Sequence, residues 1–248
     1  MSAVAKEVSN EVSNAIHIVL QGKGGVGKSL IAAFLAQYLK AKRPNVFCGD
    51  TDPVNDTFAR YGAFDAKRFN ILVGDKIDQR AFDGLIETLV EHQGPAVVDN
   101  GASTFIPLSA YMAENSVIDV LRESGKEVYI HSVLTGGQAL EDTMTGLNAL
   151  FETTPAQLVV WENEFFGEVA KDGRRFADSK LYEKNRDRVK GIVTIHKRNN
   201  DTFGKDIEQM IVNKLTFDQA MQAATLMPRQ RLKIVQKSIF DQLESIGI

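Results

Sequence analysis

Several features are scarce in this chain of 248 residues, and each scarcity excludes a class of protein. Its single cysteine, Cys48, rules out an intrachain disulfide and fits a reducing compartment. No apolar run approaches the roughly 18 residues that a membrane span requires. A formal net charge of -3 argues against binding of nucleic acid by the whole surface. We therefore expect a soluble, cytoplasmic protein with no membrane span.

What the sequence does contain is an alternation of short apolar runs with longer stretches of helical periodicity, which is typical of repeated βαβ units. The alternation predicts an α/β fold, doubly wound around a mostly parallel sheet. We expect a flexible N-terminal extension over residues 1–14 and a single domain over residues 15–248. The predicted strands are 15–20, 45–48, 69–72, 96–99, 127–133, 157–161 and 191–195, and the predicted helices are 29–40, 79–91, 138–151, 179–188 and 228–243.

The segment from Gly22 to Ser29 carries the spacing G-x-x-x-x-G-K-S directly after a predicted strand and before a predicted helix. This is the context of a phosphate-binding P-loop. Glycines let the backbone approach the phosphates, and successive N–H groups with the helix N-terminus surround the anion. Lys28 is expected to reach the β- and γ-phosphates, and the Ser29 hydroxyl to bind Mg²⁺.

The string G-K-G-G-V-G-K-S resembles the deviant Walker A motif of the ParA/MinD group of P-loop ATPases, which includes the nitrogenase iron protein. The resemblance implies an ATP-dependent homodimer in which Lys23 reaches the nucleotide of the partner subunit. A solvated loop lysine is the alternative for this residue.

Two acidic segments follow the P-loop in the order that this family shows. The resemblance implies that Asp52 positions the attacking water, that Asp50 supports the metal ion, and that Asp99 holds Mg²⁺. It also implies that the Gly101 N–H donates to the γ-phosphate. An Asx turn before Pro53 is the alternative for the first segment.

Recognition of the base is less clearly encoded. Residues 213–216 lack the aspartate of a guanine-binding motif and lie in a predicted helical stretch, so ATP is favoured. By resemblance, Asn163 contacts the adenine. The expected catalytic residues are Lys23, Lys28 and Asp52, the expected metal ligands are Ser29, Asp50 and Asp99, and the expected nucleotide-binding residues are Gly22, Lys23, Gly24, Gly25, Val26, Gly27, Lys28, Ser29, Leu30, Gly101 and Asn163.

Longer stretches resemble the TraL-type conjugal transfer ATPases of plasmids, at 19–29, 50–55, 97–111, 135–140 and 229–235. The resemblance implies an accessory ATPase that hydrolyses ATP slowly and works with other proteins of plasmid conjugation. A partition-type ATPase bound to nonspecific DNA, a nucleotide-bound adaptor with little turnover, and a metabolic P-loop enzyme remain alternatives.

Residues 171–198 carry ten lysines and arginines against four acidic residues, which suggests contact with DNA or simply a solvated face. The four histidines, by contrast, lie far apart in the sequence with no ligand spacing, so a zinc site is not expected. Cys48 and Trp161 are expected in the core.

Overall fold

The computed structural model describes residues 14–248, so the predicted extension lies outside the described residues except for Asn14. Seven strands form one sheet, and all of its neighbouring strands pair in parallel. In spatial order they are β11 (Val189–Ile195), β8 (Gln157–Asn163), β7 (Glu127–Thr135), β1 (Ala15–Val19), β6 (Ala96–Asp99), β2 (Phe47–Asp50) and β3 (Lys67–Arg68).

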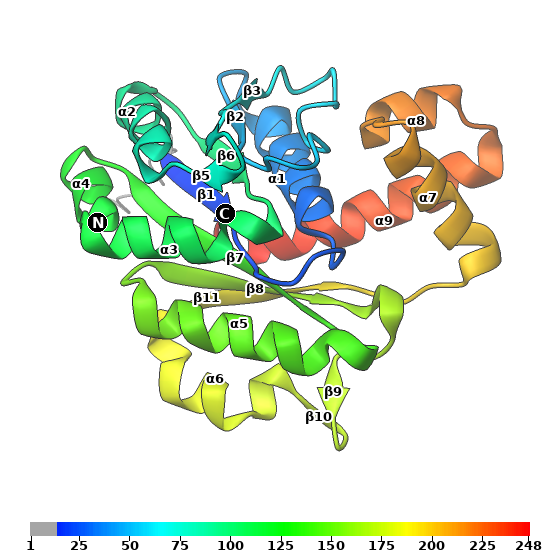
Figure 1. Ribbon diagram of the computed structural model, residues 1–248. Coiled ribbons are helices and arrows are strands. Elements are labelled where there is room, and N and C mark those ends of the chain that lie inside the picture. Colours follow the sequence, from blue (N-terminus) through cyan, green and yellow to red (C-terminus); the bar gives the residue numbers. More distant parts are fainter. Residues whose placement is uncertain (1–13) are drawn as a thin grey trace, which may run out of the picture.

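Helices cover both faces of this sheet, which is why the central strands are almost continuously apolar. Figure 1 shows α5 and α9 on opposite sides of β7, β8 and β11. Val19, Val133 and Trp161 pack with the helices of one face, whereas Ile18, Ile130 and Val160 pack with those of the other. The first face carries α1 (Lys28–Lys42), α7 (Lys205–Val212), α8 (Phe217–Ala223) and α9 (Leu226–Ser245), and the second carries α2 (Asp83–Glu91), α3 (Phe105–Glu114), α4 (Val117–Glu123), α5 (Leu140–Thr153) and α6 (Lys180–Asn185).

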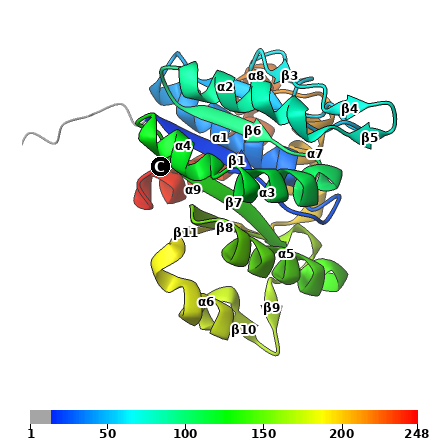
Figure 2. The same ribbon diagram turned by 60° about the vertical axis from the view of Figure 1, so that its left-hand side comes forward.

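Two small antiparallel hairpins lie outside the sheet. The first pairs β4 (Leu72–Val73) with β5 (Lys76–Ile77), and the second pairs β9 (Ala170–Lys171) with β10 (Arg174–Arg175). Figures 1 and 2 both show the β9–β10 hairpin beside α6, at the opposite end of the molecule from α8.

The predicted α/β fold with its parallel sheet is confirmed, with several corrections to the elements. The second strand is shifted from 45–48 to Phe47–Asp50. The strand predicted at 69–72 is replaced by two short strands, β3 directly before it and β4, which overlaps its last residue. Residues 213–216 are not helical, because they form the connection between α7 and α8. Helices α3, α4, α7 and α8 were not predicted.

A chain of buried hydrogen bonds crosses three strands on the face that carries α1. The Trp161 indole N–H donates to His131 Nδ1 at 3.0 Å, and His131 Nε2 lies 2.9 Å from His17 Nδ1. Because the indole can only donate, His131 must carry its proton on Nε2 and donate it to His17. Burial lowers the pKa of His17 to about 3 and holds the pKa of His131 well below its ordinary value. Both histidines are therefore neutral at pH 7.

Strand β11 lies at the edge of the sheet, where a side chain from α9 takes up some of its backbone groups. The Thr194 N–H donates to Gln242 Oε1 at 2.7 Å, and Gln242 Nε2 donates to the Thr194 carbonyl at 3.1 Å. One side chain therefore satisfies both backbone groups of this residue.

Candidate functional site

The P-loop connects β1 to α1, and two of its glycines adopt conformations that other residues avoid. Gly25 has φ +74° and Gly27 has φ +104°. Gly27 is also the N-cap of α1, and its carbonyl accepts the first helical bond, from the Ile31 N–H. The loop therefore presents backbone N–H groups and a helix N-terminus on the same side as Lys28 and Ser29.

Lys28 lies at the start of α1 and is almost fully buried, with 8% of its surface exposed. Its ammonium donates to the Lys23 carbonyl at 2.9 Å, across the P-loop. Burial lowers the pKa of Lys28, while the negative charges of Asp99 and Asp52 raise it. A buried ammonium with two carboxylates nearby fits the binding of an anionic group with a metal ion beside it.

Asp50 and Asp99 end two neighbouring strands and stand opposite each other in the register of β2 and β6. Burial raises the pKa of Asp99 to about 7, and the nearby Asp50 adds to the rise. The Ser29 hydroxyl acts in the opposite direction, because it lies close enough to Asp99 to lower the pKa of its carboxyl. Within residues 14–248, Asp99 Oδ1 is one of two buried side-chain oxygens with no hydrogen-bond partner. An unpaired carboxylate oxygen beside a hydroxyl is a fitting pair of ligands for a hard cation.

The two other acidic residues of the site are occupied by backbone contacts. Asp50 accepts from the N–H groups of Asp52 and Ala59, each at 2.9 Å. Asp52 accepts from the N–H groups of Val54 and Asn55, at 2.9 and 3.1 Å. The strand ends at Asp50, and the bond from the Val54 N–H to Asp52 forms an Asx turn around Pro53, while the catalytic role of Asp52 stays a prediction.

Gly101 follows Asp99 and lies against Asp52. A Cβ at position 101 would approach Asp52 Cγ to 2.7 Å, which is closer than real Cβ contacts come. This close approach requires glycine and brings the segment after β2 next to the segment after β6.

Lys23 points away from its own loop and forms an ion pair with Asp142 on α5, at 2.7 Å. Both side chains are about half exposed. The pair is therefore accessible to solvent, so the role of Lys23 at a dimer interface stays a prediction and the solvated loop lysine stays its alternative.

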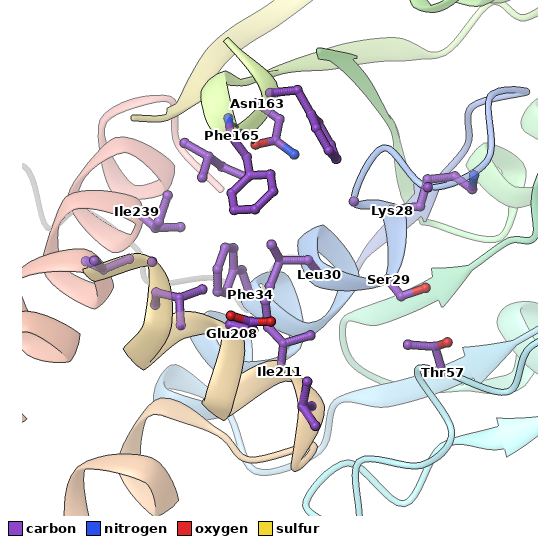
Figure 3. Close-up of a pocket in the computed structure, with 18 of the residues that line it drawn as sticks. Lys28, Ser29, Leu30, Phe34, Thr57, Asn163, Phe165, Glu208, Ile211 and Ile239 are labelled. Carbon is purple, nitrogen blue, oxygen red and sulfur yellow. Dashed lines mark hydrogen bonds between the residues drawn. The ribbon is translucent and has the colours of Figure 1, made fainter. Parts of the chain in front are cut away.

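The P-loop opens into a cavity of about 730 Å³. Figure 3 shows Lys28 and Ser29 on one side of it and Ile239 on the other. The far part is apolar, because α1, α7 and α9 contribute Leu30, Phe34, Ile207, Ile211 and Ile239. Asn163, Phe165 and residues 195–198, where β11 ends, also line the cavity. A volume of this size suits a nucleotide or another small molecule.

The structure therefore gathers the predicted residues around the carboxyl ends of β1, β2, β6 and β8. The roles assigned to them stay predictions. Three positions beside the loop were missed. Gln21 is fully buried and donates to the carbonyls of Val133 and Thr143. Asn100 donates to the Val19 carbonyl and accepts from the Thr51 hydroxyl. Phe105 packs against Gly22, where a Cβ would come within 3.1 Å of its ring.

The basic segment 171–198 is less available than its sequence suggested, because five of its ten cations contact other groups of the chain. Lys171 pairs with Glu141, Arg175 pairs with Glu162 and Glu164, Arg188 donates to main-chain carbonyls that include Phe151, and Lys190 and Arg198 lie over the rings of Tyr129 and Phe203. DNA binding through this segment stays a prediction.

Comparison with known proteins identifies the family of this chain. The family model described as the CobQ/CobB/MinD/ParA nucleotide binding domain matches residues 17–239. The chain belongs to this family. Two curated relatives from Escherichia coli, both named Protein TraL, are each 46% identical over 237 residues, covering 94% of this chain and 98% of each relative. The resemblance found in the sequence is confirmed, and with it the P-loop NTPase fold of the ParA/MinD type.

The solved structures that match this chain share little sequence with it. The MinD cell division protein of Aquifex aeolicus is 12% identical, with a TM-score of 0.49 and coverage of 94% of this chain and 98% of that one. A plasmid partition protein from Borrelia burgdorferi is 17% identical, with a TM-score of 0.45 and coverage of 81% and 97%.

Between residues 14 and 248, no helix is both long and apolar enough to cross a bilayer.

Proposed function

We propose that this protein is an ATP-dependent dimerisation switch, with slow and partner-stimulated hydrolysis, that serves as an accessory ATPase in plasmid conjugative transfer. The observation that carries the proposal is the P-loop, whose buried Lys28 lies within the electrostatic influence of Asp52 and of Asp99, a carboxylate with one unpaired oxygen. The similarity to the TraL proteins over 94% of the chain supports the role in conjugation, with other transfer proteins as partners. The single thiol, Cys48, supports work in the reducing cytoplasm.

Mg²⁺ fits the site, because Ser29 and Asp99 offer a hydroxyl and an unpaired carboxylate oxygen. We propose these two residues as ligands, Asp99 through water, with Asp50 supporting them from the next strand. Magnesium usually takes few protein ligands beside the phosphates. When bound, it would neutralise charge on the β- and γ-phosphates.

Other residues of the chain bind the phosphates and position the attacking water. The loop N–H groups from Gly24 to Ser29 surround the phosphates, and the Lys28 ammonium leaves the Lys23 carbonyl for them. Gly101 offers its N–H to the γ-phosphate. Asp52, held in its turn beside Gly101, orients the attacking water.

Lys23 is proposed to reach the nucleotide of a second subunit. To do so it must leave Asp142, and an exposed ion pair of this kind contributes only about 0.2–1 kcal/mol. Contact with a triphosphate can offset that cost, because the triphosphate carries several negative charges where Asp142 carries one. The ion pair therefore does not prevent a switch of partner.

Two substitutions test the proposal. Lys28→Ala should weaken ATP binding on the order of a hundredfold, because it removes a charged donor from a buried site. Lys40→Ala, in the last turn of the same helix, is the matched control and should bind normally. Asp52→Ala should keep ATP bound and accumulate dimer, measured by light scattering of the apo, ADP and ATP forms.

Hydrolysis separates this proposal from its alternatives. Asp52→Ala turning over ATP at the wild-type rate would remove its water-positioning role. Turnover that stays absent with transfer proteins present would instead favour a nucleotide-bound adaptor. DNA binding that weakens steeply with salt would favour the partition-type alternative.

A further inference from the structure

Asn163 ends β8 and is nearly buried, with 3% of its surface exposed. Both ends of its amide are in use. Nδ2 donates to the Val26 carbonyl of the P-loop at 3.0 Å, and Oδ1 accepts from the Phe165 N–H at 3.1 Å. A Cβ on Gly27 would lie 3.0 Å from the same Nδ2. The amide is therefore packed against the P-loop backbone and offers little surface to a base.

The bond to Val26 has a direct effect on the anion site. In a planar trans peptide, the carbonyl and the following N–H point in opposite directions. Holding the Val26 carbonyl toward Asn163 therefore turns the Gly27 N–H to the opposite side. Gly27 has φ +104°, a conformation that the loop must keep in order to aim its N–H groups.

At the same end of the cavity, Phe165 has a largely exposed ring, which meets the Phe166 ring edge-on with 4.9 Å between centroids. Phe165 is 60% exposed, follows Asn163 by two residues and lines the cavity. Figure 3 shows it beside Asn163 and across the cavity from Ile211. An exposed aromatic ring at a nucleotide site offers a face on which any base can stack.

From this geometry we propose that Asn163 is a positioning residue of the P-loop, and that the base is held by stacking on Phe165 instead of by the Asn163 amide. The inference rests on the proposed binding of ATP by this loop. Two residues of one short segment would then have different tasks. Asn163 would position the P-loop that binds the phosphates, and Phe165 would stack on the base.

Calorimetric titration with ATP, GTP and tripolyphosphate, each with Mg²⁺, tests both halves. Asn163→Ala should weaken ATP and tripolyphosphate equally, by roughly tenfold, because it frees the Val26 carbonyl. The ratio of ATP to GTP affinity should not change. Phe165→Ala should weaken ATP by roughly tenfold and leave tripolyphosphate unchanged. Phe165→Tyr, which keeps the ring, is the matched control and should bind ATP as the wild type does.

Several results would overturn the inference. If Asn163→Ala weakens ATP alone, or abolishes the preference between ATP and GTP, then Asn163 recognises the base. If it changes neither ligand, the positioning role is wrong, and if Phe165→Ala binds ATP normally, the stacking role is wrong. Phe165 is exposed, so its variants should fold even where Asn163→Ala does not. A wild-type protein that binds neither ATP nor tripolyphosphate would instead refute the proposed function itself.

Discussion

The buried histidine pair should make the protein sensitive to acid. The pKa of His17 is about 3 in the folded protein, against the ordinary 6.5 of an unfolded histidine. Between these two values the unfolded chain binds more protons than the folded one, so stability falls as the pH falls. From pH 7 to pH 4.5 this residue alone should remove about 2.5 kcal/mol from the free energy of unfolding.

Replacing His17 by glutamine isolates this effect. The new side chain does not titrate, and its oxygen can still accept the bond from His131. Urea unfolding at pH 7 and pH 4.5 should show that the loss of stability on acidification is about 2.5 kcal/mol smaller in His17→Gln than in the wild type. Val133→Ala, a buried change that does not titrate, should lower stability equally at both pH values.

The result that refutes the reasoning is specific. If the wild type and His17→Gln lose the same stability between the two pH values, burial of a neutral His17 is not a source of acid sensitivity. If the wild type becomes more stable on acidification and His17→Gln does not, the pKa of His17 is raised in the folded protein and not lowered.

Three further predictions concern stability and reactivity. Asp142→Asn should change the free energy of unfolding by no more than about 1 kcal/mol, because its pair with Lys23 is exposed, and a larger change in urea unfolding would contradict this. Gly146→Ala should lower the free energy of unfolding by about 1–3 kcal/mol and weaken ATP binding, since the new Cβ would meet Gln21 Oε1 at 2.1 Å. Gly84→Ala is the control, because it has open space around it, and it should change neither urea unfolding nor ATP titration. Burial raises the pKa of Cys48 to about 12, so iodoacetamide at pH 8 should label the folded protein about a thousandfold more slowly than the unfolded protein. Mass spectrometry measures the two labelling rates, and equal rates would show that the thiol is accessible.

The parts of the site that sequence predicted are those encoded locally. The glycines, Lys28 and Ser29 are fixed by their spacing between a strand and a helix. Asp50 and Asp99 were assigned by resemblance, through the order of their segments after the P-loop, and they end the neighbouring strands β2 and β6.

The parts that were missed depend on strand order. Gln21 bonds to the carbonyl of Thr143, and His17 to the ring of His131, over more than a hundred residues of sequence. Neither pairing has a spacing signal, because each arises only when β7 lies beside β1. The basic segment misled for the same reason, since Arg175 and Lys171 meet acidic partners on other elements. The short strands near residue 70 carry too few apolar residues to be located.

The glutamine of the last helix at the sheet margin has a consequence for how copies of this protein can associate. An open strand is a template on which another chain can add its own, and such addition leads to uncontrolled polymers. By saturating Thr194, Gln242 interrupts that template. Replacing Gln242 with alanine would leave the N–H and carbonyl of Thr194 free to pair with a strand of another molecule. With glutamine in place, association of two copies is favoured through other surfaces.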